Sequence, residues 1–374
     1  MKFTLSSSTL SNKLNILSKV IMSKNAMPIL EGILFEVSDG QLTLTASDNE
    51  NVMRSTCILS DSDGDGRFVV SSNTMLNAVR ELPEQPLTFE INEEDFSVSL
   101  YYQNGMYRFT AQNADEYPQT QPLPTDVTTI VFESSELLSN ISRTLFATAT
   151  EQLRPVMNGI YFDITTEFTS IVASDGTKLV RNRCYNVKND TPAAFILPKK
   201  PATLLKNVLT KEEGSVVIRF NDRNAAISFA EGVLICRLIE GRYPNYNSVI
   251  PKDNPNHLRI DRKTFASALR RVMPFGSESS ELVKIMVEAG QMVVLSEDID
   301  FATSAKENLL CEYDGRPMAI GFKGPVLLDI LNNIDSDDVI IELADPSRAG
   351  VVVPAEQPQN EEVLMLIMPT LLND

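Results

Sequence analysis

The residue types that most often carry chemistry are scarce and scattered in this chain. Its 374 residues include one histidine, His257, and the four cysteines form no C-x-x-C pair. One histidine cannot supply a multi-histidine metal cluster, and no G-x-S-x-G motif offers it a nucleophile. We therefore interpret His257 as a loop residue and expect neither a metal nor a cofactor. We interpret the cysteines as inert thiols of a reducing compartment: Cys57, Cys184, Cys236 and Cys311.

Acidic residues form two further candidates for chemistry. The run Asp61-Ser62-Asp63-Gly64-Asp65-Gly66 matches the first half of a calcium-binding loop, but its twelfth position is Ser72 and no helix precedes it. It is better interpreted as an acidic turn between strands. Asp48 and Asp175 could form a pair of catalytic carboxylates. Each lies in a Ser-Asp turn at the same place of an internal repeat, which favours a structural role. No Walker A or G-x-G-x-x-G motif occurs, so nucleotide hydrolysis would have to come from a partner.

The elements that position these residues recur along the chain. Four identities are separated by the same 127 positions: Gly32 and Gly159, Phe35 and Phe162, Asp48 and Asp175, Arg54 and Arg181. A short apolar strand followed by a helix occurs three times, at 67–79, 195–209 and 318–331. A repeat of about 120 residues is too long for a solenoid, so each copy is predicted to be a domain. The predicted domains are 1–124, 125–252 and 253–374, joined by proline-rich linkers at 118–124 and 251–255.

Strand signals dominate each copy. Alternating apolar residues at 41–45 follow an Asp-Gly turn, and two strand-like runs flank Asn104-Gly105, a strong hairpin signal. Each copy also carries about two amphipathic helices. The predicted helices cover 8–22, 71–81, 134–149, 199–211, 261–272 and 323–334. The fold class is therefore predicted to be α+β, with three similar domains of antiparallel sheets and a few helices gathered on one side.

Positive charge is concentrated on the predicted helices. The chain has a net charge of −17, yet the six segments hold 13 of its 33 Lys and Arg and only 4 of its 50 Asp and Glu. On the helix at 199–211 the lysines lie opposite the apolar arc, and the helix at 261–272 has a similar division. Lysines are common on solvated faces, so each helix alone could be ordinary. Taken together, these faces predict a surface that attracts phosphate in a protein that otherwise repels it.

The order and spacing of several motifs resemble the family of the beta subunit of bacterial DNA polymerase III, the sliding clamp, over essentially the whole chain. The motifs are Met1-Lys2-Phe3-Thr4, Met27-Pro28-Ile29-Leu30, Asn158-Gly159-x-x-Phe162, Ala173-Ser174-Asp175-Gly176, Leu238-Ile239-Glu240-Gly241-Arg242-Tyr243-Pro244-Asn245-Tyr246, Ile320-Gly321-Phe322 and Leu366-Ile367-Met368-Pro369. The resemblance implies the DNA clamp fold, in which three domains form half of a six-domain ring with its helices on the inner face.

Two of the surfaces implied by this resemblance concern the ring itself. Two chains would close head to tail, with edge strands pairing at the junction; Tyr107, Pro274 and Phe275 match that dimer interface. Double-stranded DNA would pass through the hole without sequence readout. The residues expected to be close to DNA are Lys24, Arg80, Lys199, Lys200, Lys206, Lys263, Arg270 and Arg271.

The third implied surface is a pocket for short peptides of the Q-L-x-L-F kind, an apolar cleft that would anchor one or two side chains. Its expected residues are Met157, Ser174, Gly176, Thr177, Lys178, Leu179, Pro244, Val249, Ile367, Met368, Pro369 and Thr370. Two departures from the family pattern indicate a different peptide preference. Thr370 replaces a more apolar residue, and Asn373-Asp374 extend the chain with an added acid.

The function expected from this resemblance is that of a processivity factor, a non-catalytic subunit of a DNA polymerase holoenzyme. Its expected partners are the replicative polymerase, an ATP-dependent clamp loader, repair polymerases, mismatch-repair proteins and ligase. No secretory signal or membrane span is visible in the sequence, so we expect a cytoplasmic, nucleoid-associated protein. Two other functions stay open at this point. One is an acidic protein-interaction scaffold that never encircles DNA, and the other is a carboxylate-dependent hydrolase.

Overall fold

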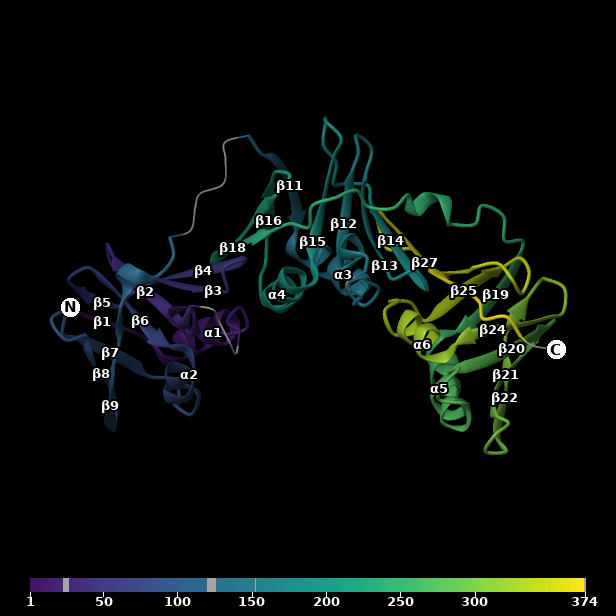
Figure 1. Ribbon diagram of the computed structural model, residues 1–374, viewed down its shortest axis with the longest axis horizontal. Helices are drawn as coiled ribbons and strands as arrows, with labels where there is room; N and C mark the ends of the chain where they lie inside the picture. Colours follow the sequence, from purple (N-terminus) through teal and green to yellow (C-terminus); the bar gives the residue numbers. More distant parts are fainter. Residues whose placement is uncertain (23–26, 120–125, 152, 373–374) are drawn as a thin grey trace. The chain divides into compact units, whose positions relative to one another are not determined.

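The computed structural model describes residues 1–22, 27–119, 126–151 and 153–372 (Figure 1). By their internal contacts the residues form two compact units. Unit 1 comprises Met1–Leu138 and Lys200–Leu238, and unit 2 comprises Ser139–Lys199 and Ile239–Asp374. Across the described ranges, no helix combines the length and the apolar character needed to cross a membrane.

Each unit contains two antiparallel sheets. In unit 1 the five-stranded sheet has the order β5 (Asp61–Asp63), β1 (Lys2–Ser6), β7 (Pro86–Ile91), β8 (Ser97–Tyr102), β9 (Gly105–Thr110). Its nine-stranded sheet has the order β10 (Gln112–Asn113), β6 (Gly66–Ser71), β2 (Gly32–Ser38), β3 (Gln41–Ser47), β4 (Asn51–Ile58), β18 (Gly232–Arg237), β17 (Asn224–Phe229), β16 (Ser215–Phe220), β11 (Thr128–Glu133). In unit 2 the nine-stranded sheet has the order β15 (Ala193–Pro198), β12 (Gly159–Ile164), β13 (Thr169–Ser174), β14 (Lys178–Cys184), β27 (Glu361–Ile367), β26 (Gly350–Pro354), β25 (Asp338–Leu343), β19 (Asn256–Asp261), β23 (Glu312–Tyr313). The four-stranded sheet has the order β22 (Thr303–Leu310), β21 (Gln291–Asp298), β20 (Leu282–Glu288), β24 (Met318–Lys323).

The six predicted helices are present, and each begins directly after a strand. They are α1 (Ser7–Leu17), α2 (Ser72–Arg80), α3 (Ser134–Leu145), α4 (Lys199–Leu209), α5 (Arg262–Val272) and α6 (Gly324–Asn332). Three of these helices start at a Ser or Asp whose side chain accepts a hydrogen bond from the amide of a threonine three residues later: Ser6 and Thr9, Ser71 and Thr74, Asp261 and Thr264. The sequence therefore contains the local signal that ends each of these strands and starts the helix.

Helix α1 is shorter than predicted. It ends at Leu17 rather than at residue 22, because the next amides turn to carbonyls three residues back: Lys19 donates to Ile16 and Val20 to Leu17. Helix α3 also ends early, at Leu145 rather than at residue 149. Buried side chains continue past both ends, since Val20 after α1 and Ala147 after α3 are fully buried.

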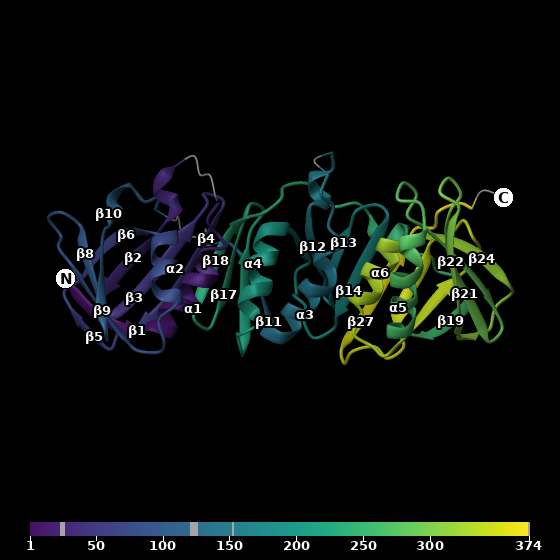
Figure 2. The same ribbon diagram turned by 90° about the horizontal axis from the view of Figure 1, so that it is seen from below.

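Phenylalanines form the core between the two sheets of unit 1. Phe3 stacks on Phe89 at 4.8 Å within the five-stranded sheet, and Phe35 stacks on Phe68 at 5.2 Å in the nine-stranded sheet. The two pairs contact each other, with the Phe3 and Phe68 ring centres 6.4 Å apart. Helices α1 and α2 pack side by side, and α1 contacts β3 and β4 of the nine-stranded sheet (Figure 2).

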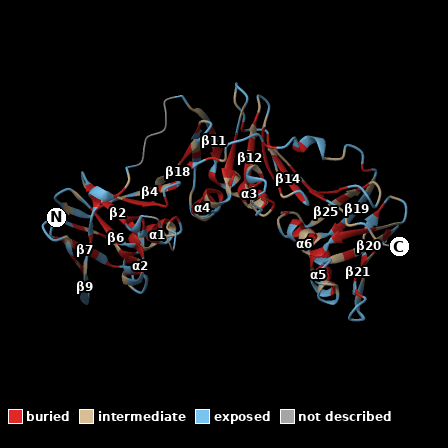
Figure 3. Ribbon diagram, in the orientation of Figure 1, coloured by how far each residue is buried: buried red, intermediate tan, exposed pale blue. Residues whose placement is uncertain are grey.

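Unit 2 has a core of the same kind. Helices α5 and α6 pack together, and their buried faces include Phe265, Leu269, Leu327 and Leu331 (Figures 2 and 3). These side chains join residues of both sheets, such as Ile285 of β20, in one apolar cluster. Burial of this size is the main source of stability for such a unit.

Each nine-stranded sheet joins strands from two copies of the repeat. In unit 1 β4 pairs with β18, and in unit 2 β14 pairs with β27. The middle copy is therefore shared, since β11 and β16–β18 belong to unit 1 whereas β12–β15 belong to unit 2. We call these two pairings the first seam (β4–β18) and the second seam (β14–β27). The domain limits expected from the repeat stay a prediction, because sheet pairing groups the chain by seams instead.

Candidate functional sites

The expected peptide pocket begins at the tight turn between β13 and β14. Asp175 accepts hydrogen bonds from the amide and hydroxyl of Thr177, both at 2.8 Å, and from the amide of Lys178 at 3.0 Å. The Lys178 ammonium lies 2.6 Å from the other Asp175 oxygen. Ser174 closes the turn by donating to the Lys178 carbonyl, and Gly176 adopts a φ of +92° that suits glycine.

Hydrogen bonds to the cation and to the turn amides set the charge state of Asp175. Burial raises the pKa of this carboxyl, but hydrogen bonds from Lys178 and Thr177 outweigh burial and hold the pKa below its usual 3.8. Asp175 is therefore an ionised structural residue of the turn. Lys178, an expected pocket residue, is buried and directs its charge to Asp175 rather than outward.

The chain end is tied to this turn. The Met368 amide donates to the Thr177 carbonyl at 2.9 Å, and two residues later the Thr370 amide donates to the Gly321 carbonyl at 2.8 Å. The tail therefore passes from the β13–β14 turn to β24. Met368 stays half exposed and Ile367 is buried, so the tail presents one thioether beside the turn. Asn373-Asp374 lie outside the described residues.

Tyrosines form the apolar base of this region. Tyr161 stacks on Tyr243 at 4.6 Å, and the Tyr246 hydroxyl donates to Asp163 at 2.7 Å. Tyr243 and Tyr246 pack in one cluster with Leu179. The structure thus brings the turn, the tail and the tyrosine segment together within unit 2.

The remaining expected pocket residues lie on segments flanking this base. Pro244 and Val249 are exposed on either side of Tyr246, in the segment that contains the 3-10 helix η4 (Tyr246–Ser248). Met157 is buried at the end of the 3-10 helix η3 (Pro155–Met157), where its carbonyl accepts from the Ala149 amide. Pro369 and Thr370 are half-buried on the tail.

Unit 1 repeats the Asp175 turn at Asp48. The Asp48 carboxylate accepts from the Glu50 and Asn51 amides at 3.0 and 2.7 Å. It also binds the ammonium of Lys200. Asp48 and Asp175 are therefore each occupied by their own turn, as predicted for structural residues, and they belong to different units.

The expected DNA-facing cations are in two different situations. Arg80 and Lys206 are exposed on α2 and α4, as is Lys199 at the start of α4. Lys200 instead binds Asp48 and donates to the Val20 carbonyl at 2.7 Å. Lys24 lies outside the described residues.

All three expected cations of α5 contact polar partners within unit 2. Lys263 lies 4.0 Å from Asp337, Arg270 donates to Asn332 at 2.7 Å, and Arg271 forms two hydrogen bonds with Glu307 at 2.5 and 2.7 Å. Because these groups are exposed, each pair contributes little to stability and can exchange partners.

The expected dimer residues lie on or beside sheet edges. Tyr107 is on β9, the last strand of the five-stranded sheet, and packs on Tyr102 at 4.9 Å. Pro274 and Phe275 belong to the 3-10 helix η5 (Met273–Phe275), where the Phe275 carbonyl accepts from Thr303 of β22 at 3.0 Å. Strand β22 is itself the last strand of the four-stranded sheet.

Sequence reasoning missed three apolar residues near this edge. Ile299, Phe301 and Leu310 are 86%, 81% and 88% exposed, at the β21–β22 turn and at the end of β22. The signal was available, because Ile299 and Phe301 alternate with acids in a turn where apolar side chains have no local core to enter.

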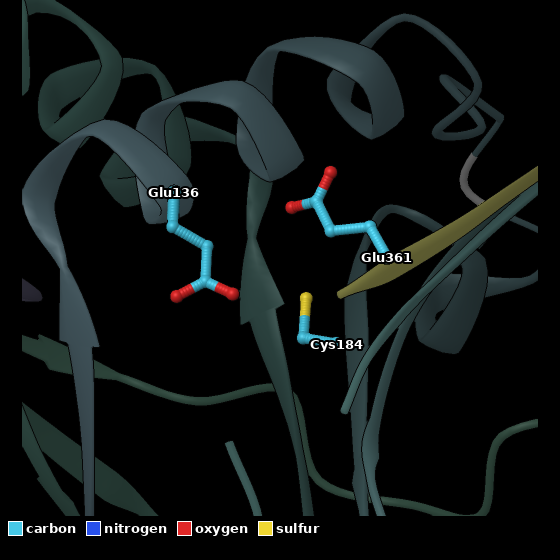
Figure 4. A group of neighbouring side chains, drawn as sticks. All are labelled: Glu136, Cys184 and Glu361. Carbon is cyan, nitrogen blue, oxygen red and sulfur yellow. The ribbon is translucent and has the colours of Figure 1, made fainter. Parts of the chain in front are cut away.

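Side chains of kinds that bind metals are drawn in Figure 4, which labels Glu136, Cys184 and Glu361. Cys184 and Glu361 face each other across the second seam. The Glu361 carboxylate accepts from Arg143 at 2.5 Å and from Asn140 at 2.7 Å. The arginine thus balances the charge of the Glu361 carboxylate. We interpret Glu361 as a structural residue of the second seam.

Solved structures with this arrangement are sliding clamps. The chain superposes with a TM-score of 0.93 on the Pseudomonas aeruginosa sliding clamp bound to griselimycin, at 23% identity. It superposes with a TM-score of 0.90 on the DNA polymerase III beta subunit of Thermotoga maritima, at 26% identity. Both comparisons cover 100% of each chain. The fold is therefore the DNA clamp fold.

Sequence comparison gives the family. The models of the DNA polymerase III beta subunit match in order, with the N-terminal domain at residues 1–121, the central domain at 132–245 and the C-terminal domain at 247–370. The Caulobacter vibrioides beta sliding clamp is 26% identical over 371 residues, covering 98% of this chain and 99% of that protein. The Pseudomonas putida beta sliding clamp is 24% identical, covering 100% of both. The chain belongs to the DNA polymerase III beta subunit family.

Proposed function

We propose that this protein is a DNA sliding clamp, a non-catalytic processivity factor of DNA replication. The observation that supports it best is the ordered match of all three beta subunit domains within one clamp fold. A clamp acts by topology, because a closed ring stays on DNA without tight contacts. A clamp needs no catalytic residues, which agrees with the use of Asp48 and Asp175 as turn residues.

The ring would be a homodimer closed through the two sheet edges. Among the described residues, β9 and β22 pair with a neighbour on one side only. An exposed edge invites pairing with another strand, and apolar residues such as Phe275 and Phe301 would be buried there. Joining β9 of one protomer to β22 of its partner at both junctions would pair these two edges of each protomer and close the ring.

We propose that double-stranded DNA passes through the ring. Exposed cations on the helices, Arg80, Lys199 and Lys206 among them, would contact phosphates without reading bases. The acidic remainder of the chain would repel DNA elsewhere.

Clamp-binding peptides are the proposed second ligand, at the pocket formed by the β13–β14 turn, the tail and the tyrosine base. The replicative polymerase, a clamp loader, repair polymerases, mismatch-repair proteins and ligase would dock there in turn. Thr370 makes one wall more polar than in the family pattern, so we expect a peptide preference of its own. We propose that a protein with these partners works in the cytoplasm, at the nucleoid.

The decisive experiment loads the protein onto nicked circular DNA with an ATP-dependent loader and then linearises the circle. A clamp is retained on the circle and slides off the linear form. Native mass measurement should give a dimer of two 41.5 kDa chains. Equal retention on circular and linear DNA, or a monomer that persists at micromolar concentration, would refute the proposal. Peptide binding without retention would favour the acidic scaffold.

A further inference from the structure

Two lysine–carboxylate pairs lie at the opposite ends of the first seam. Strands β4 and β18 run antiparallel, with Asn51 opposite Cys236 at one end and Ser55 opposite Gly232 at the other. Lys200 binds Asp48 just beyond the first end, and Lys13 binds Glu231 just beyond the second.

The two pairs cross the seam in opposite directions. At the first end the cation belongs to the middle copy, on α4, and the carboxylate to the first copy, in the β3–β4 turn. At the second end the cation is Lys13 of α1, in the first copy, and the carboxylate is Glu231 of the β17–β18 turn. Lys200 also donates to the Val20 carbonyl at 2.7 Å, in the turn that follows α1.

Each pair has one buried member. The Asp48 side chain is 3% exposed, whereas Lys200 is 36% exposed. Lys13 is 6% exposed and lies 2.8 Å from Glu231 and 3.0 Å from the Ser55 hydroxyl. Removing the exposed partner would leave a buried charge uncompensated, which is strongly destabilising. Burial of one member also makes salt screening weaker for these pairs than for pairs that are fully exposed.

The strands of the seam approach each other closely at Gly232. A Cβ atom on Gly232 would lie 2.2 Å from the Arg54 carbonyl oxygen, so the strands approach as closely as their backbones permit. The amides of Thr56 and Arg237 extend the backbone pairing to the Glu231 and Glu50 carbonyls. An open pocket of about 360 Å3, lined by both Lys13 and Glu231, lies beside this pair.

We propose that Lys200 and Lys13 are positioning residues that lock the first seam, and that Lys200 does not contact DNA although its neighbours on α4 do. The locks hold α1 and α4 at a fixed spacing, so the exposed Lys206 keeps its place relative to the first copy. Lys200 is thus distinguished from Lys206 by its partner and not by its residue type. This assignment rests on the proposed clamp function only where it concerns DNA.

Hydrogen exchange of the full-length protein tests the lock. Lys200→Met should speed exchange of the amides in β4 and β18 at least about tenfold, since a hydrogen bond to a charged group contributes about that factor or more. Lys200→Arg should restore most of the protection. Asp48→Asn should recover part of it in the Lys200→Met background, because the buried charge is gone. Glu231→Gln should speed exchange of the Thr56 amide, at the other end of the seam. Lys206→Gln should change the exchange of none of these amides.

The salt dependence of binding to a short DNA duplex tests the proposal that Lys200 does not contact DNA. The slope of log K against log salt is negative, and Lys206→Gln should reduce its magnitude by about 0.9, the value for one phosphate contact. Lys200→Met should leave the slope unchanged. Unchanged exchange in Lys200→Met, or a slope reduced in magnitude as in Lys206→Gln, would overturn the assignment. If neither variant changes the slope, the proposed DNA-facing surface is wrong, and the lock is judged by exchange alone.

Discussion

Replacing Asp175 with alanine should weaken peptide binding by loosening the turn between β13 and β14. The carboxylate receives hydrogen bonds from both Thr177 and Lys178, at 2.6 to 3.0 Å. The Thr177 carbonyl in turn accepts the Met368 amide at 2.9 Å. Losing the carboxylate therefore releases the turn and the tail together.

The structure limits the size of this effect. A hydrogen bond to a charged group contributes about 1.5–3 kcal/mol, but the Asp175 side chain is 23% exposed and water would replace part of the loss. We expect a decrease of about 2–3 kcal/mol in the free energy of unfolding rather than the sum of all the bonds. Only part of this free energy holds the turn in the geometry that binds the peptide. We therefore expect peptide affinity to drop about tenfold, or about 1.4 kcal/mol.

Acid should reproduce the effect. The pKa of Asp175 lies below its usual 3.8 in the folded protein. Its contribution to stability is therefore complete above the unfolded pKa and is lost as the pH falls through the lower folded value. The free energy of unfolding should therefore decrease as the pH falls below about 4. Asp175→Asn should remove this decrease.

Fluorescence anisotropy with a labelled Q-L-x-L-F peptide, together with urea unfolding, measures both quantities. The matched control is Asp48→Ala, which removes the equivalent turn residue from unit 1 and should leave peptide affinity unchanged. An Asp175→Ala protein that is destabilised but binds the peptide normally would refute the link between turn and pocket. Equal loss of affinity in both variants would show a general effect of stability.

Three further changes test other parts of the molecule. Phe275→Ala should weaken self-association at least about tenfold in sedimentation equilibrium, because a half-exposed ring at the β22 edge would lose its partner surface; an unchanged dimer constant would exclude this edge. Phe265→Ala should lower the free energy of unfolding by about 3–5 kcal/mol in urea, since the ring is fully buried between α5 and the sheets of unit 2; a loss below 1 kcal/mol would contradict that core. Gly232→Ala should lower the melting temperature and expose β18 amides to exchange, because its Cβ would collide with the Arg54 carbonyl; normal protection there would show that the first seam can adjust.

Local features of this fold were accessible from sequence. The helices could be predicted because each has an amphipathic face and several begin at a capping Ser or Asp. The role of Asp48 and Asp175 could be predicted because a Ser-Asp turn satisfies its own carboxylate within three residues. Such signals act over a few positions, so they survive without knowledge of tertiary contacts.

Features that depend on distant pairing were not accessible. The repeat identifies three copies along the sequence. The compact units, however, are set by the strand that pairs with β4 and the strand that pairs with β27. The partner of Lys200 is 152 positions away, so helical periodicity could place this lysine on a polar face but not assign it to Asp48. The exposed Phe301 is a different case, because its alternation with acids in the β21–β22 turn is visible in the sequence.

Counting cations on helices therefore overstates the charge available to DNA. Lys13 and Lys200 are bound to carboxylates at the first seam, and in each of these pairs one member is buried. A protein that depended on affinity for DNA would lose by such pairing, because each phosphate contact given up weakens binding. The proposed clamp would depend instead on encircling DNA, so cations that join two copies of the repeat within the chain can be spared from phosphate contact. The pairing of Lys200 with Asp48 is thus better suited to a clamp that slides than to a protein that grips.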